Sequence, residues 1–363
     1  MSILAVVALL TLLVGAAPVL VAVGLVVDGV RGRGQLPSVR LWAFAVQFLA
    51  LDVVAVVAAA SLWICFRPFG RLRGDASLAW HGRFQWWWTG QVMGAARRCL
   101  GLRFVVAGPV TVGSATAGPG ARGPLVVLGR HCSSGDALLP LLLFGHQQRM
   151  HLRYVIAQGL AWDPALDLFG HRLRNHFVDR ETAGLHDLLA VGRLARGMAD
   201  NDAAVIFPEG QFFTVARHQQ AMDRMRHDDP ARAARLAGLA HLLAPLPGGV
   251  LALLGAAPPQ TDVVVVGHVG FERYSTLAEV WRNLPFTEPV VVQTWRFAAE
   301  QVPKSRRQRM EWLDQRWLDL DQWIAESVAG VSSDRSPGRA GSGPGVRRNA
   351  SWLLRPRRRP SGT

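Results

Sequence analysis

Cysteine and charged residues are scarce in this sequence, and each shortage excludes a class of protein. The three cysteines, Cys65, Cys99 and Cys132, are scattered along 363 residues, so neither a disulfide framework nor a zinc site is expected. Only 18% of the residues are charged, against roughly 25% in ordinary soluble domains. Half of the residues are hydrophobic. This balance favours a chain with membrane segments, and no residue pattern indicates a metal or a redox cofactor.

Lysine is nearly absent as well, because Lys304 is the single lysine and arginine supplies the other basic side chains behind a net charge of +14. About half of that excess lies in residues 331–363, which are rich in Gly, Pro and Ser and are expected to form a disordered basic tail. No nucleic-acid recognition motif accompanies the charge, so nucleic acid is not an expected partner. Trp352 and its arginine neighbours could bind anionic lipid, and a merely solvated tail explains the composition equally well.

Two long apolar runs lie near the N-terminus. Residues 3–27 contain no charged side chain, and residues 41–66 contain only Asp52. Each run has about 25 residues, or roughly 37 Å as a helix, which is enough to cross the hydrocarbon core of a bilayer. The first run is too long for a secretory signal, and no basic residue precedes it. The sequence therefore predicts a two-helix transmembrane hairpin over residues 1–66, with a hairpin that enters only one leaflet as the alternative.

The short loop of this hairpin puts both of its ends, and the main domain, on one side of the membrane. The stretch after the second helix carries four arginines and the loop carries three, which favours a cell-membrane protein with its main domain on the cytoplasmic face. Because a charge is costly at mid-membrane, Asp52 is expected to face the first helix or a polar pocket.

Residues 67–330 alternate between short β-branched segments and helical patterns. This alternation predicts an α/β domain built on a mixed sheet flanked by helices. The predicted strands are 102–106, 125–128, 203–207, 263–266 and 290–294, and the segments 154–157 and 175–178 are interpreted as strands or turns. The predicted helices are 80–100, 137–144, 185–199, 230–244 and 310–328. The first of these helices is interpreted either as an interfacial amphipathic helix or as an ordinary core-facing one.

The segment from Arg130 to Asp136 carries a candidate catalytic pair. It follows an apolar strand, and we expect the turn after the strand to bring His131 and Asp136 together before a helix that Ser133 or Ser134 caps. A carboxylate beside a histidine selects its tautomer and stabilises the imidazolium that forms on proton uptake. Such a base suits the activation of an alcohol. Taken alone, a hydrogen-bonded surface histidine explains the pair as easily.

Two other nucleophilic mechanisms receive little support. The chain has no Gly-x-Ser-x-Gly segment, so a serine hydrolase is not indicated. Cys132 is adjacent to His131, but neighbouring side chains at a turn point apart, and Cys132 is interpreted as a packing residue.

Four ordered segments resemble the conserved blocks of the glycerophospholipid acyltransferase family, specifically the 1-acylglycerol-3-phosphate acyltransferases. The resemblance covers about residues 102–328. The four segments are His131-x4-Asp136, Phe177-Val178-Asp179-Arg180, Phe207-Pro208-Glu209-Gly210 with Thr214, and Pro245-Leu246-Pro247-Gly248-Gly249. Their order and spacing make the match more specific than any one segment.

The resemblance implies that His131 deprotonates a glycerol hydroxyl, which attacks the thioester of acyl-CoA or acyl-carrier protein as co-substrate. It implies that Arg180 binds the phosphate of the acceptor as a planar fork of donors. The other residues that it places at the substrate are Pro208, Glu209, Gly210 and Thr214. Glu209 is interpreted either as a direct contact to an acceptor hydroxyl or as a structural carboxylate that holds the turn. Membrane lipids are the expected partners.

Two of the four segments depart from the family pattern. Gln211-Phe212 replaces the usual Thr-Arg of the third block, and Leu246 replaces the arginine of the fourth. Arg217 could substitute for one missing cation; otherwise the acceptor is another lysophospholipid or a glycolipid. The predicted function is acyl transfer in phospholipid biosynthesis or remodelling. The alternatives are a membrane scaffold without catalysis and an acyl thioesterase.

Overall fold

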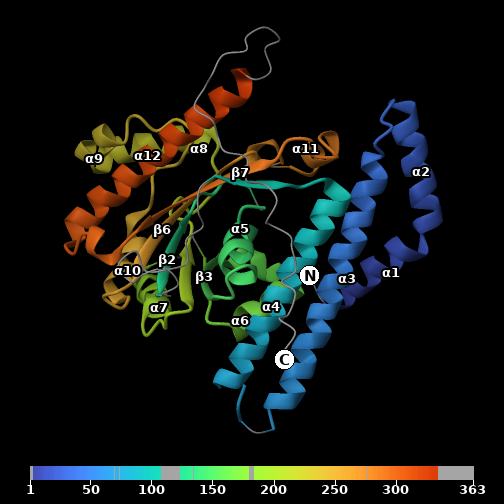
Figure 1. Cartoon of the computed structure of the whole chain (residues 1–363), viewed down its shortest axis with the longest axis horizontal. Helices are drawn as coiled ribbons and strands as arrows, with labels where there is room; N and C mark the ends of the chain where they lie inside the picture. Colours follow the sequence, from blue (N-terminus) through green and yellow to red (C-terminus); the bar gives the residue numbers. More distant parts are fainter. Residues whose placement is uncertain are drawn as a thin grey trace, which may run out of the picture.

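A seven-stranded mixed sheet forms the centre of the molecule, with strand order β1-β7-β6-β2-β5-β3-β4 (Figure 1). The computed structural model describes residues 3–333 except 69, 73, 108–122, 134, 180–183 and 275, so the predicted tail beyond residue 333 lies outside the described residues. The strands are β1 (Phe104–Ala107), β2 (Leu125–Gly129), β3 (His151–Ala157), β4 (His176–Val178), β5 (Asp202–Ile206), β6 (Asp262–Val269) and β7 (Val290–Phe297). Each of the five predicted strands overlaps one of them, and the two segments interpreted as strands or turns overlap β3 and β4.

The direction of the strands decides which loops meet. All neighbouring pairs are parallel except β6 and β7, which are antiparallel. The strands β2 to β6 therefore all end at one edge of the sheet. The central strand β2 lies between β5 and β6, so the loops that follow these three strands converge there.

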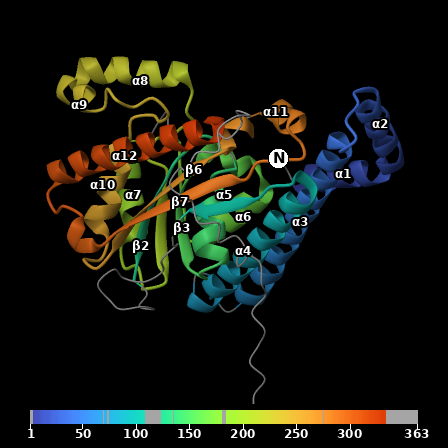
Figure 2. The ribbon, with the colours of Figure 1, turned by 45° about the horizontal axis from the view of Figure 1, so that its top comes forward.

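The sheet separates two apolar layers. Successive side chains of a strand point to opposite faces. Accordingly Val126 and Leu128 of β2 pack in one hydrophobic cluster, and Leu125 and Val127 pack in the other. Helices α7 (Leu185–Ala195), α10 (Pro247–Ala256) and α12 (Arg306–Ser333) cover the first face. The second face is covered by α5 (Leu138–Pro140) and the π-helical turns η1 (Ala96–Leu100) and η2 (Leu141–His146). Figure 2 shows α12 lying across the sheet. The predicted α/β sheet flanked by helices is confirmed.

Several helices differ from the sequence-based prediction. The helix expected at 230–244 is only α9 (Pro230–Arg235), and the residues after it form a turn whose backbone N–H groups at Ala240 and His241 donate to the side chain of Asp321. The helix expected at 80–100 is α4 (Asp75–Ala95) continued by η1, and it is core-facing, since Trp88 and Val92 are buried. Four helices were not predicted: α6 (Pro164–Arg172), α8 (Val215–Asp228), α10 and α11 (Leu277–Arg282). Three short 3-10 turns complete the described elements: η3 (Gln158–Trp162), η4 (Phe271–Tyr274) and η5 (Ala299–Gln301).

The first apolar run is not one straight helix. It forms α1 (Ile3–Gly15) and α2 (Ala17–Val30), which meet at an angle of 66°. The break coincides with Pro18, whose ring cannot donate a helical hydrogen bond and clashes with the preceding turn. The second run is α3 (Pro37–Phe66), the one helix among the described residues that is by itself long and apolar enough to cross a membrane. The predicted hairpin of two spanning helices is therefore not confirmed.

Helix α3 lies along the main domain rather than above it (Figure 1). It contacts α4 and α6, and its small residues Ala55 and Ala59 share a hydrophobic cluster with Trp88 and Phe169. Asp52 is on this same buried face, and 2% of its surface is exposed. Asp52 therefore faces the domain rather than lipid. This position agrees with the high free-energy cost of exposing a charged side chain to the interior of a bilayer.

The loop between α2 and α3 is attached to the domain through α11. The guanidinium groups of Arg31 and Arg33 stack on the ring of Trp281 at 4.6 and 5.0 Å from its centroid. Trp281 also donates from Nε1 to Ser38 Oγ at 2.9 Å. Ser38 in turn donates to Asp28, which is fully buried. These contacts hold the start of α3 beside the elements that follow β6.

Candidate active site

The candidate site lies where β2, β5 and β6 end. His131 follows β2 by two residues, Phe207 follows β5 directly, and His268 is the last residue but one of β6. In open sheets of this type, ligands bind outside the carboxyl ends of the parallel strands. The catalytic pair predicted from the sequence is therefore at the edge where a substrate is expected.

His131 and Asp136 contact each other as predicted. Nδ1 of His131 lies 3.0 Å from Oδ1 of Asp136, whose side chain is fully buried, while 20% of the His131 side chain remains exposed. A carboxylate only accepts, so Nδ1 carries the hydrogen and Nε2 of His131 is left as a base. The second oxygen, Oδ2, accepts from the backbone N–H groups of Cys132 at 2.6 Å and Ser133 at 2.7 Å. Asp136 is thus held at both oxygens.

Among the described residues of this turn, no serine side chain caps the next helix, although the sequence predicted such a cap by Ser133 or Ser134. Ser133 Oγ accepts from Gly135 N–H at 3.2 Å, and α5 begins later, at Leu138, without a side-chain cap. The carboxylate of Asp136 takes the hydrogen bonds of the turn instead. Ser134 lies outside the described residues.

Two phenylalanine rings enclose the imidazole of His131. Their centroids lie 4.7 Å (Phe207) and 4.4 Å (Phe212) from the centroid of the His131 ring. Gly129 makes room for the first ring, because a Cβ at this position would lie 2.6 Å from Phe207. The N–H of Phe213 donates to the carbonyl of His131 at 3.2 Å. His131 therefore sits in an aromatic slot that is partly open to solvent.

Glu209 joins three segments of the site. Its Oε1 accepts from His131 N–H at 2.8 Å, and its Oε2 accepts from Leu243 N–H at 3.0 Å. The residue is 2% exposed, and burial raises its pKa to about 8 against the two N–H donors and Arg130. Both oxygens are occupied inside the protein, which favours the structural interpretation of Glu209 over direct contact with an acceptor.

The rest of the loop after β5 is also internally bonded. Gly210 has φ +66°, a conformation that glycine adopts without strain, and its N–H donates to the carbonyl of Phe207 at 2.9 Å. Pro208 accepts through its carbonyl from Leu246 N–H at 2.8 Å. Thr214 caps α8 by accepting from Arg217 N–H at 3.2 Å.

The predicted substrate residues are only partly brought together. Pro208, Glu209 and Gly210 belong to the loop that contacts His131, and Thr214 and Arg217 follow it at the exposed start of α8. The guanidinium of Arg217 donates to the carbonyl of Phe212 at 3.1 Å, so this cation lies beside the aromatic slot. Arg180 lies outside the described residues.

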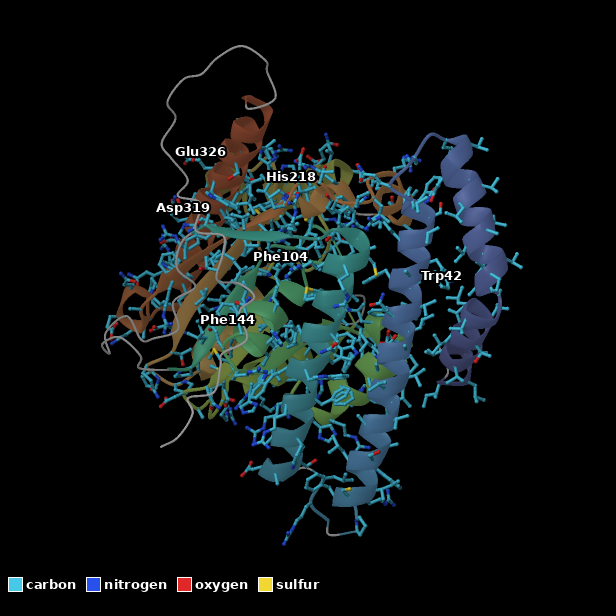
Figure 3. All side chains as sticks on the ribbon, turned by 45° about the vertical axis from the view of Figure 1, so that its right-hand side comes forward. Trp42, Phe104, Phe144, His218, Asp319 and Glu326 are labelled. Carbon is cyan, nitrogen blue, oxygen red and sulfur yellow. The ribbon has the colours of Figure 1, made fainter. Side chains whose placement is uncertain are left out.

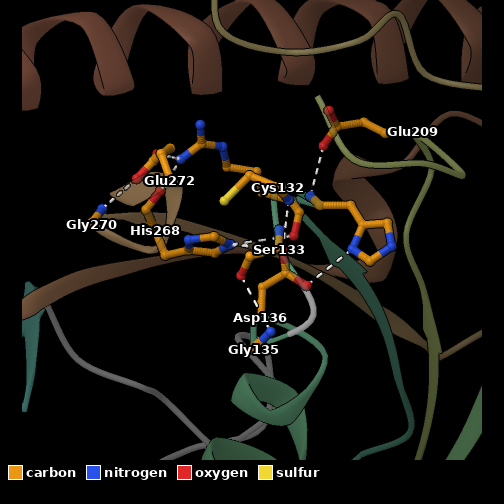
Figure 4. A network of polar contacts seen from close by, with 10 residues as sticks. Cys132, Ser133, Gly135, Asp136, Glu209, His268, Gly270 and Glu272 are labelled. Carbon is orange, nitrogen blue, oxygen red and sulfur yellow. Dashed lines mark hydrogen bonds and ion pairs between the residues drawn. The ribbon is translucent and has the colours of Figure 1, made fainter. Parts of the chain in front are cut away.

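A second polar group lies behind the catalytic pair (Figure 4). Arg130, which is 2% exposed, pairs with Glu272 and donates to the carbonyl of His268. Glu272 accepts from Gly270 N–H at 2.6 Å. His268 is buried, and burial together with the charge of Arg130 lowers its pKa to about 4, which keeps the ring neutral. The contacts among Arg130, His268 and Glu272 were not predicted from the sequence. Two signals were present, because Arg130 directly precedes His131 and His268 interrupts an otherwise apolar strand.

Cys132, Asp136 and His268 each present a possible metal ligand, and the three atoms lie within 4.8 Å of one another. A metal requires a thiolate, whereas burial raises the pKa of the Cys132 thiol well above its ordinary value. The oxygens of Asp136 already accept three hydrogen bonds. This donor set does not fit a metal, and the same burial supports Cys132 as a packing residue.

A groove away from His131 carries several basic side chains. It has a volume of about 400 Å³ and lies at the amino ends of β3 and β4. Its lining includes Arg153, Arg174, His176 and Arg193. Arg153 is committed to Asp202 at 2.5 Å and to backbone carbonyls, so part of this positive charge is structural.

The comparison with known families agrees with the position of the site. Residues 110–246 match the family model described as Acyltransferase, and this segment contains His131, Asp136 and the whole loop after β5. The matched part is less than half of the chain, and no curated protein matches the sequence. Over these residues the chain is similar to acyltransferases, which supports a general acyltransferase activity for this protein.

Proposed function

We propose that the protein is a membrane-associated O-acyltransferase. It transfers a fatty acyl group from acyl-CoA or acyl-carrier protein to the hydroxyl of a lysophospholipid such as 1-acylglycerol-3-phosphate, in phospholipid synthesis or remodelling. One observation carries this proposal. The His131–Asp136 pair lies at the carboxyl edge of the sheet, inside the segment that matches acyltransferases, and its Nε2 has no hydrogen-bond partner among the described residues.

The geometry supports a general-base reaction. Nε2 of His131 takes the proton of the acceptor hydroxyl, and the hydroxyl oxygen attacks the thioester carbonyl carbon. The C–S bond then breaks, and the leaving thiolate takes the proton back from His131. Asp136 stays ionised and stabilises the imidazolium between the two steps. Because Cys132 is buried and protonated, no covalent acyl-enzyme on this residue is needed.

The acceptor side of the proposal rests on Arg217, Thr214 and the loop after β5, and on Arg180, which lies outside the described residues. Arg180 and Arg217 are proposed to bind an acceptor phosphate, and Thr214 and the loop Pro208–Gly210 to border the acceptor. Arg180→Ala should raise KM for a phosphate-bearing acceptor and leave KM for the thioester unchanged; equal changes in both would remove Arg180 from this role. Phe212 and the half-exposed Leu246 are apolar, so we propose that an apolar part of the acceptor contacts these two side chains.

The proposed membrane contact is through α1, α2 and α3. These helices expose apolar side chains, among them Leu12, Val26, Val57 and Ile64. The domain flanks α3 through α4 and α6, and the exposed His171 near the end of α6 is a polar side chain that does not suit a bilayer interior. We therefore favour insertion into one leaflet, with the main domain on the cytoplasmic face of the cell membrane.

An acyl-transfer assay tests the proposed function directly. Purified full-length protein is incubated with labelled acyl-CoA and a panel of lysolipids, and free CoA and the acylated product are measured by mass spectrometry. His131→Ala should lower kcat by at least about 10²-fold, whereas His227→Ala, an exposed histidine on α8, should leave it unchanged.

Other outcomes of the assay are equally informative. Release of CoA without any acceptor would favour a thioesterase. No release of CoA with any acceptor would favour a scaffold. Activity of His131→Ala equal to that of the wild type would refute the assigned base.

A further inference from the structure

His268 lies near Asp136 (Figure 4), on the side of Oδ2, whereas His131 contacts Oδ1. Its side chain is 1% exposed. Nε2 of His268 lies 3.4 Å from the carbonyl oxygen of Arg130 and 3.8 Å from Oδ2 of Asp136. Nδ1 has no hydrogen-bond partner among the described residues. A buried polar atom without a partner is unfavourable, so the histidine requires an explanation beyond packing.

The surroundings of the ring determine its tautomer. Both groups near Nε2, a carbonyl and a carboxylate, only accept hydrogen bonds, so Nε2 carries the hydrogen and Nδ1 is bare. The charged and titratable groups that face the ring are Arg130, Asp136 and Glu272, together with the thiol of Cys132. Arg130 lies close enough to oppose a positive charge on the imidazole.

The backbone of His268 is held tightly against β2. Arg130 donates to the carbonyl of His268 and pairs with Glu272, and its own N–H donates to Val266. Glu272 binds back to Gly270 N–H. The imidazole therefore has little freedom to move away from Asp136, and the direction of Nε2 is set by the end of β6.

We propose that His268 is a positioning residue for the catalytic pair. Its Nε2–H contacts the carbonyl of Arg130 and lies 3.8 Å from Oδ2 of Asp136, so its dipole acts on this oxygen through space in addition to the hydrogen bonds from the N–H groups of Cys132 and Ser133. They keep Oδ1 directed at His131 and hold Asp136 ionised while His131 carries the transferred proton. The inference rests on the proposed function in that His131 is taken as the base.

Two substitutions at His268 separate positioning from packing. His268→Leu keeps the volume and removes the N–H, whereas His268→Gln can place an amide N–H at the position of Nε2. The leucine variant should lower kcat by about tenfold, as loss of an orienting outer partner commonly does, with KM for both substrates unchanged. It should move the acid limb of the kcat/KM profile to higher pH, because one fewer dipole then offsets the negative charge that Asp136 presents to His131. The glutamine variant should retain most of the wild-type kcat and a pH profile close to that of the wild type.

Val266→Ala is the matched control, because Val266 is buried on the same face of β6. It should lower Tm without moving the pH profile. A second readout needs no catalysis: the proton between His131 and Asp136 gives a downfield resonance in proton NMR, assigned by its loss in Asp136→Asn. This resonance should broaden or shift in His268→Leu and persist in His268→Gln.

The outcomes divide clearly. An unchanged resonance and pH profile in His268→Leu would overturn the proposal. So would a glutamine variant as impaired as the leucine variant with an equal loss of Tm, because that indicates packing alone. If the wild-type protein transfers no acyl group but the resonance changes as expected, the proposed function fails and the positioning role stands.

Discussion

At the scale of single residues, the site combines one partly exposed group with several buried ones. His131 is the group of the pair that reaches solvent, whereas Asp136 and Glu209 are buried and bound to backbone N–H groups. A buried carboxylate is stable only when such donors compensate for lost hydration. The two acids therefore stabilise the turn after β2 and the loop after β5, and the imidazole of His131 is the group placed to react with a substrate.

Glu209 should make stability depend on pH. Its pKa in the folded protein is raised to about 8 from an ordinary value of 4.5. Between these values the folded protein retains a proton that the unfolded chain has lost, so stability falls as pH rises through this range. In Glu209→Gln this contribution disappears. Thermal unfolding at pH 5 and pH 8 should show a smaller loss of Tm in the variant; parallel curves would contradict this.

Gly129 tests the aromatic slot. A Cβ at this position would meet the Phe207 ring at 2.6 Å, so Gly129→Ala forces the ring to shift against His131. We expect about a tenfold loss of kcat, since small displacements at a reacting group are costly. Gly255→Ala is the control, because its Cβ would meet nothing within 4 Å. Steady-state kinetics of both variants checks this, and equal activities would show that the slot tolerates the shift.

At the scale of secondary-structure elements, α12 holds the segment that leads to the site. Asp314 of α12 accepts from the guanidinium of Arg232 at 2.7 to 3.1 Å, and Arg232 also donates to the carbonyl of Pro245 at 2.7 Å. The next residue, Leu246, bonds to Pro208 in the loop of the site. The terminal helix is thus connected to the site through one buried ion pair.

Loss of Asp314 should be strongly destabilising. Asp314 is 1% exposed, and its removal leaves the buried charge of Arg232 without its acid partner. A broken buried pair typically costs about 3–5 kcal/mol. Denaturant unfolding of Asp314→Ala should show a loss of this size. The exposed pair of Asp223 and Arg226 provides the comparison, since Asp223→Ala should cost at most about 1 kcal/mol. Similar losses in the two variants would contradict the argument.

The elements were predictable to different degrees, for physical reasons. The strands were found because a strand buried on both faces is a continuous apolar run, as in β5 and β6. Helix α8 was missed because it is polar on nearly all sides, with Met222 its single buried residue. Helix α10 was missed because it is apolar all round and begins with Pro-Gly-Gly. Neither helix shows the one-sided pattern on which prediction relies.

At the scale of the whole molecule, the N-terminal helices and the domain form one body (Figure 3). Trp42 in α3 donates to the carbonyl of Leu13 in α1 at 3.2 Å, and Arg40 donates to the carbonyl of Cys99 at 3.3 Å. One side of α3 is therefore buried against protein, and its other side exposes Val57 and Ile64. This one-sided exposure is consistent with the proposed insertion into a single leaflet.

The exposed face of α3 should decide membrane association. Val57 and Ile64 are 59% and 64% exposed, so glutamates there should weaken lipid contact without disturbing the fold. We expect the double variant to shift from the membrane pellet to the soluble fraction, with an unchanged circular dichroism spectrum. Leu189→Glu, on α7 and 59% exposed, should remain in the pellet. Retention of the double variant at wild-type level would assign membrane binding to other surfaces.

The sequence by itself determined the α/β class, the positions of the strands and the pair His131–Asp136, since strand burial and a short turn are local properties of the chain. Only the tertiary structure decided the course of α3 along the domain, the bond of Glu209 to Leu243 and the place of His268 near Asp136. These features join residues far apart in the sequence, and their meeting depends on the order of the strands in the sheet, which no local pattern encodes.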